Sequence, residues 1–128
     1  MNELHQSIIQ NYIEAYNRFD IDGMLKDLHP NVLFENVVDD TADLKIEGVE
    51  AFRKHAESGL GFFSDREQQV RSWGSQYDVV SIEVDYNATL QVDLPNGMNV
   101  GDVISLQWKS VFTFMENQII MIQDVIPN

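Results

Sequence analysis

Two long stretches of alternating apolar and polar residues constrain this fold more than any other feature of the chain. From Ile82 to Asp93 the even positions are apolar or aromatic and the odd positions are polar. The stretch from Asp102 to Met115 repeats the period of two, with an inward set formed by Ile104, Leu106, Trp108, Ser110, Phe112 and Phe114. Such alternation predicts strands with one buried and one exposed face. Because Leu94-Pro95-Asn96-Gly97 supplies turn residues between them, we predict one long antiparallel hairpin.

A hairpin of this length twists and coils, so its apolar face becomes concave and needs a cover. The N-terminal segment can supply it, because apolar residues recur there at helical spacing as far as Phe19: Leu4, Ile8, Ile9, Tyr12, Ile13 and Tyr16. Asp20 is a natural N-cap for a second helix over 21–29, which Pro30 ends. The sequence therefore predicts a lined pocket between the first helix and the sheet.

The remaining segments complete an α+β pattern. Strands are predicted over residues 32–38, 44–47, 67–75 and 118–126, with a third helix over 49–58. The inward face of 67–75 is ambiguous, because Val70 and Trp73 differ in parity. Without a repeat or a linker, this order indicates a single α+β domain over residues 1–128, with three helices against a mainly antiparallel sheet.

Composition and charge exclude several classes of function. The chain of 128 residues has a formal net charge of −13 and no cysteine. This charge repels phosphate backbones and anionic lipids, so neither a nucleic acid nor a membrane is an expected partner. Without cysteine there is no disulfide, thiol nucleophile or thiolate metal site. The three histidines match no metal motif, and no nucleotide-binding loop is present, so we expect neither a metal nor a cofactor. The first residues carry no signal-peptide pattern, so we expect a cytoplasmic location.

A resemblance to a known family runs through the whole chain. The run YIEAYNRFDIDGMLKDLHPNVLFENV, the short strand LKIEG and the helix that begins after Gly48 resemble the nuclear transport factor 2-like superfamily, and within it the SnoaL-like branch. That branch includes polyketide cyclases and is related to ketosteroid isomerases. The resemblance implies a cystatin-like, cone-shaped barrel: a strongly bent sheet wrapped on a long helix, with a ligand cavity between them. It also implies a homodimer through the outer face of the sheet.

The isomerase relatives do not match this chain at their catalytic positions. They combine a tyrosine on the first helix, a carboxylate base on the first strand and an acid on the penultimate strand. By resemblance these positions fall on Tyr12, Asn36 and Ser110. Neither an amide nor a hydroxyl can replace a carboxyl group in proton transfer, so ketosteroid isomerase activity is not expected.

Asp124 is the candidate for acid–base chemistry. If Ile120, Ile122 and Ile126 face the cavity, Asp124 faces it too, as one carboxylate among aliphatic residues. In the SnoaL-like cyclases the acid–base group lies on the closing strand, so the position of Asp124 resembles that of the cyclase group. Burial raises a carboxyl pKa above its usual value of ~3.9, which suits proton transfer near neutrality. The alternative is a structural Asp124 that reaches water, or that pairs with Arg71 or a backbone amide.

The predicted site is therefore a pocket for a small apolar or aromatic molecule. Asp124 and Tyr12 are its candidate catalytic residues. Its candidate ligand-binding residues are the inward polar and aromatic side chains Tyr16, Phe34, Asn36, Tyr86, Trp108 and Ser110. The chemistry would be of cyclase, isomerase or dehydratase type. The alternative is a non-catalytic ligand-binding or assembly domain, in which the same side chains are plain core.

The sequence also predicts the homodimer. The expected outer face of the last strand is apolar at Ile119, Met121 and Val125, and Val103 and Val111 lie on the neighbouring strand. Sedimentation velocity at micromolar concentration should therefore give twice the mass of the chain. A sharp monomer boundary over that range would contradict the prediction.

Overall fold

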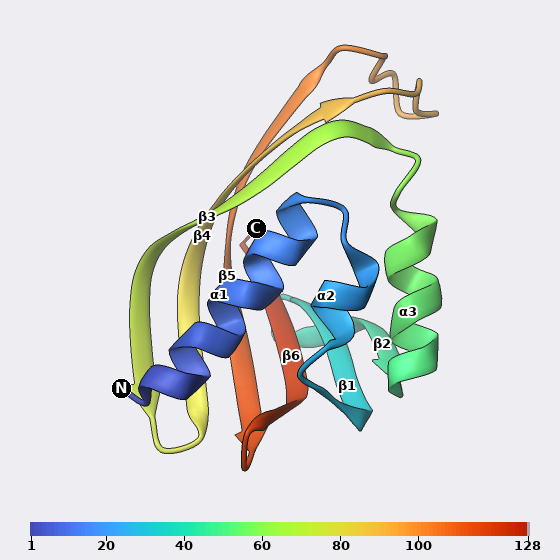
Figure 1. Ribbon diagram of the computed structural model, residues 1–128. Coiled ribbons are helices and arrows are strands. Elements are labelled where there is room, and N and C mark those ends of the chain that lie inside the picture. Colours follow the sequence, from blue (N-terminus) through green and yellow to red (C-terminus); the bar gives the residue numbers. More distant parts are fainter. Residues whose placement is uncertain (128) are drawn as a thin grey trace.

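The computed structural model describes residues 1–127, which form three helices beside one six-stranded sheet (Figure 1). The elements in chain order are α1 (Glu3–Asn17), α2 (Ile21–Leu25), β1 (Leu28–Val38), β2 (Thr41–Glu47), α3 (Val49–Ser58), β3 (Phe63–Gln76), β4 (Val79–Leu90), β5 (Val103–Met115) and β6 (Gln118–Ile126). The strand order is β2-β1-β6-β5-β4-β3, and β1 with β6 is the parallel pair in an otherwise antiparallel sheet. The predicted α+β fold is confirmed.

The core lies between α1 and the concave face of the sheet. Figure 1 shows α1 lying across the inside of the bend that β3, β4 and β5 make. Ile9 of α1 and Val84 of β4 are completely buried, and Tyr12 meets Phe112 edge to face with ring centroids 5.8 Å apart. This is the helix-on-hairpin packing that the two sequence patterns predict. No helix within residues 1–127 is long and apolar enough to cross a membrane.

The second helix is shorter than predicted. Asp20 does cap α2, accepting a hydrogen bond from the Gly23 N–H at 3.0 Å, but the helix ends at Leu25. Leu28 instead begins β1, where it pairs with Ile119 of β6 and is 5% exposed. Pro30 lies inside an irregularity of the β1–β6 pairing, where no ladder hydrogen bond is required of it. Long-range strand pairing therefore overrides the helical pattern over these residues.

The hairpin turn is also longer than predicted. β4 ends at Leu90, and residues 91–102 form a loop instead of extending the ladder to Val92. Polar side chains stabilise this loop, because Asp93 accepts from the Val100 N–H at 2.9 Å and Asp102 accepts from the Asn99 N–H at 2.8 Å. Such side-chain-to-backbone bonds compete with strand pairing.

Two β-bulges shift the inward faces of β3 and β6. In β3 the register shifts between Val70 and Ser72, so Val70 and Trp73 both pack against the core despite their opposite parity. In β6 the shift brings Ile119, not Ile120, onto the core, where it is fully buried. The prediction that Ile120 faces inward and Ile119 outward is therefore wrong, whereas Ile122 faces the core as predicted.

The outer face of the sheet carries a mixed set of side chains. Val103 is 61% exposed there, but Ile119 does not contribute because it belongs to the core. Arg71 makes ion pairs on this side with Glu83 at 3.1 Å and Asp85 at 2.8 Å. The homodimer stays a prediction.

Gly23 fits its place because no side chain has room there. A Cβ atom would lie 2.5 Å from Asp20 Oδ2 and 2.9 Å from Ala15 Cβ, and the capping hydrogen bond holds Asp20 in position. We expect Gly23→Ala to lower the free energy of unfolding by about 1–3 kcal/mol, although alanine favours helices. Urea unfolding measures the change. Gly61→Ala is the control, because nothing lies within 4 Å of a Cβ there. Equal stabilities for the two variants would contradict this close approach.

Candidate functional site

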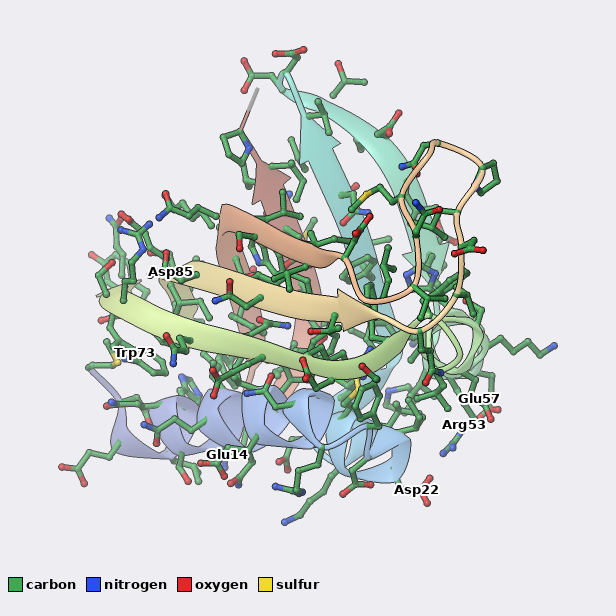
Figure 2. The ribbon with its side chains drawn as sticks, turned by 90° about the horizontal axis from the view of Figure 1, so that it is seen from above. Glu14, Asp22, Arg53, Glu57, Trp73 and Asp85 are labelled. Carbon is green, nitrogen blue, oxygen red and sulfur yellow. The ribbon has the colours of Figure 1, made fainter. Side chains whose placement is uncertain are left out.

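A cavity of about 320 Å³ lies between the helices and the concave face of the sheet. Its lining comes from all three helices and from β1, β3, β5 and β6, so it forms only in the complete fold. Figure 2 shows Asp22 and Arg53 on the outer side of α2 and α3, where their 2.9 Å ion pair joins the two helices beside the cavity. The lining residues are Tyr12, Tyr16, Met24, Phe34, Asn36, Phe52, His55, Ala56, Ser58, Gly59, Phe62, Phe63, Arg66, Gln68, Trp108 and Asp124.

Asp124 is held at the cavity wall by its two neighbouring strands. In the ladder it stands opposite Ser110 of β5 and beside Asn36 of β1. The Ser110 hydroxyl donates to Asp124 Oδ1 at 2.6 Å, and Trp108 Nε1–H donates to Ser110 Oγ at 3.0 Å. These two hydrogen bonds from β5 fix the orientation of the Asp124 carboxyl group. The carboxyl group therefore stays available to the cavity.

The environment of Asp124 favours its protonated form. Burial raises the pKa of Asp124 to about 6, and the hydrogen bond from Ser110 opposes this rise in part. The alternative pairing with Arg71 is wrong, because Arg71 binds Glu83 and Asp85. A carboxyl group with this pKa can both accept and donate a proton near neutrality.

Two hydrogen-bonding groups beside Asp124 have no hydrogen-bond partner in the described part of the chain. Within residues 1–127, neither the Tyr12 hydroxyl nor the Asn36 side-chain amide makes a hydrogen bond, and both residues line the cavity. Burial raises the pKa of Tyr12 well above its usual value, and the negative charge of Asp124 adds to the rise. Tyr12 therefore stays a neutral hydroxyl that can donate to a ligand.

The other predicted site residues divide into two groups. Tyr16, Phe34 and Trp108 line the cavity. Tyr86 and Ser110 lie behind the lining: the Tyr86 and Tyr16 hydroxyls are hydrogen-bonded at 2.9 Å, and Ser110 is 2% exposed. Neither residue lines the cavity, and their hydrogen bonds position Tyr16 and Asp124, which do.

Arg66, Gln68 and His55 line the cavity and were missed by the sequence analysis. Arg66 lies before the strand predicted over 67–75, and the inward face of that strand, which includes Gln68, was ambiguous because the bulge after Val70 changes the parity. Their spacing of two, continued by Val70, is the signal that could have found them. Within residues 1–127, no cluster of three or more His, Asp or Glu side chains could hold a metal ion.

A second hollow, of about 540 Å³, lies along the part of β5 that extends past β6. Its lining includes one carboxylate, Asp85, which is already paired with Arg71. The cavity at Asp124 is therefore the candidate functional site.

Comparison with solved structures supports the fold. AclR from Streptomyces galilaeus, a proposed hydroxylase, superposes with a TM-score of 0.77 at 22% identity over 95% of this chain and 87% of its own. A proposed SnoaL-like polyketide cyclase from Jannaschia sp. CCS1 gives 0.80 at 12% identity, over 95% and 84% of the two chains. TerC, co-crystallised with polyporic acid, gives 0.76 at 15% identity, over 96% and 90%. At these identities the likeness establishes the cone-shaped fold alone.

Comparison with protein families goes further. No curated protein matches the sequence. The model of the SnoaL-like domain matches residues 9–122, from within α1 to within β6. The chain therefore belongs to the SnoaL-like domain family.

Proposed function

We propose that the cavity binds a small apolar or aromatic molecule and that Asp124 transfers a proton to or from it. The observation that carries this proposal is the position of Asp124: a carboxyl group, with a pKa that burial raises to about 6, at the wall of a cavity that aromatic rings also line. A general acid or base works best when its pKa is near the working pH. The family is consistent with this function, because its members typically bind small ligands in cyclase or isomerase roles.

The residues around Asp124 divide the work. The aromatic rings of Phe34 and Trp108 offer flat apolar walls for a ring system. The Tyr12 hydroxyl and the Asn36 amide offer hydrogen bonds to a carbonyl oxygen of the ligand, and a donor aimed at that oxygen stabilises the negative charge that develops when a neighbouring proton leaves. Ser110 holds the carboxyl group in one orientation.

The first test is proton exchange. Incubated in D2O with a panel of small aromatic ketones, the protein should exchange the hydrogens next to the carbonyl, as followed by ¹H NMR. Asp124→Asn should slow this exchange by roughly 10²–10⁴-fold, because the base is lost. Tyr12→Phe should slow it by roughly tenfold or more, because one donor is lost. In the wild type the rate should rise with pH around a midpoint near 6, where Asp124 ionises.

The controls separate catalysis from binding. Asp85→Asn removes the same charge from the outer face of the sheet and should leave the exchange rate unchanged. Ketones that bind in the cavity, as measured by calorimetry, without any exchange would overturn the catalytic proposal and favour the non-catalytic ligand-binding alternative.

The second test is stability. The folded pKa of Asp124, about 6, lies above its value near ~3.9 in an unfolded chain, so this group favours the folded state at low pH. That contribution is complete below the unfolded pKa and is lost as the pH rises through the folded one. Asp124→Asn removes a charge whose burial disfavours folding at neutral pH by about 2–3 kcal/mol.

We therefore expect Asp124→Asn to be more stable than the wild type at neutral pH, by an amount that shrinks towards zero near pH 4. Urea unfolding of both proteins over this pH range measures the difference. Asp85→Asn is again the matched control and should show no such gain. An amide variant that is the less stable protein at neutral pH would falsify the assignment of a raised pKa.

A further inference from the structure

Arg66 brings a buried positive charge to the same cavity. The residue lies on β3 and is 7% exposed. Its Nε–H donates to the Tyr16 carbonyl at 2.9 Å, and its guanidinium carbon lies 3.6 Å from the centroid of the Tyr16 ring and 4.5 Å from that of Phe19. These contacts hold the guanidinium group in one place, so its remaining N–H groups have a defined direction.

The charge of Arg66 is not balanced by the protein. Its Nη2 is buried without a hydrogen-bond partner, and no carboxylate oxygen of residues 1–127 lies within 4.0 Å of the guanidinium group. Arg18, Arg53 and Arg71 differ from it, since each makes an ion pair at the surface. A buried charge without a partner strongly disfavours folding. A ligand that completes the pair would remove this penalty.

Asp124 does not supply the missing charge. Both residues line the cavity, but they make no ion pair. Their charges act on the pKa of Tyr12 in opposite directions, since Asp124 raises it and Arg66 lowers it. The cavity therefore has a proton-exchanging carboxyl group and a separate fixed cation, with hydroxyl groups of α1 beside them. That separation suits a ligand with two different polar ends and an apolar body.

We propose that the ligand carries an anionic oxygen group, a carboxylate or an ionised enol, which pairs with the guanidinium group of Arg66 where it faces the cavity. The inference rests on the proposed function, because it names the chemical class of the molecule that this cavity takes. A hydrogen bond between a guanidinium group and an anionic oxygen is charge-assisted, so it contributes direction as well as affinity. The overall charge of −13 repels anions at long range, so selection of an anion needs a local cation of this kind.

The test compares an anionic and a neutral probe of nearly the same shape. 2-Naphthoate and 2-naphthamide share one aromatic body, but the first is an anion at neutral pH and the second is neutral. By calorimetry, the wild type should bind naphthoate roughly tenfold or more tightly than naphthamide, as expected for one charge-assisted hydrogen-bonded pair. Arg66→Met, which keeps an unbranched apolar stem but removes the charge, should reduce this ratio to about one while naphthamide binding persists. Arg66→Lys should restore part of the preference.

Arg71→Met is the matched control, because it removes an arginine from the same strand that is paired on the outer face; its ratio should equal that of the wild type. If Arg66→Met does not fold, the wild-type ratio and that of Arg66→Lys decide. Equal binding of both probes by the wild type, or tighter binding of the amide, would overturn the anionic ligand and leave the proposed function standing. If neither probe bound, the aromatic-binding cavity itself would be refuted, and the inference with it.

Discussion

The structure depends on covering a bent sheet with a helix that is too short to cover all of it. The apolar face of β4, β5 and β6 must leave water, and α1 buries the part that it reaches. The helix ends at Asn17, and Phe19 then turns the chain with a positive φ of 61°. Beyond this point α2 and α3 approach the sheet from the side and leave a hollow between them. The cavity is therefore a product of the same packing that stabilises the domain, and the end of α1 determines where it lies.

Much of the fold could be predicted because its strongest patterns are periodic. Alternation identified β4 and β5, and helical spacing identified α1, since each reflects one buried face. The errors lie where local chemistry or long-range pairing overrides the period. Side-chain hydrogen bonds of Asp93 and Asp102 stabilise the loop after β4. Leu28 belongs to β1 because it pairs with β6. The bulges of β3 and β6 each insert one residue, and a prediction that assumes strict alternation of inward and outward residues cannot detect them.

The candidate site shows the same division. Asp124, Tyr12 and Asn36 could be named in advance because each is a polar residue at an apolar, inward position. Arg66 could not be named so easily, because it lies among polar neighbours and only its spacing of two from Gln68 and Val70 indicates an inward face. Nor could the sequence distinguish a residue that touches the cavity from one that stands behind it. Ser110 and Tyr86 face inward as predicted, yet their hydrogen bonds to Asp124 and Tyr16 depend on the strand and helix pairings that only the fold provides.

The parallel pairing of β1 with β6 has a consequence for how the site comes into being. It places Asn36 beside Asp124, and the neighbouring bond between Gln123 and Glu35 joins residues 88 positions apart in the chain. Closing so long a loop is entropically unfavourable, and contacts of this range slow the folding of a domain. During synthesis, β6 leaves the ribosome after the five strands that it joins in the sheet. A nascent chain that holds only α1 and the β4–β5 hairpin thus lacks Asp124 and the β1 and β6 parts of the cavity wall, so the cavity is complete only after β6 has paired with β1 and β5.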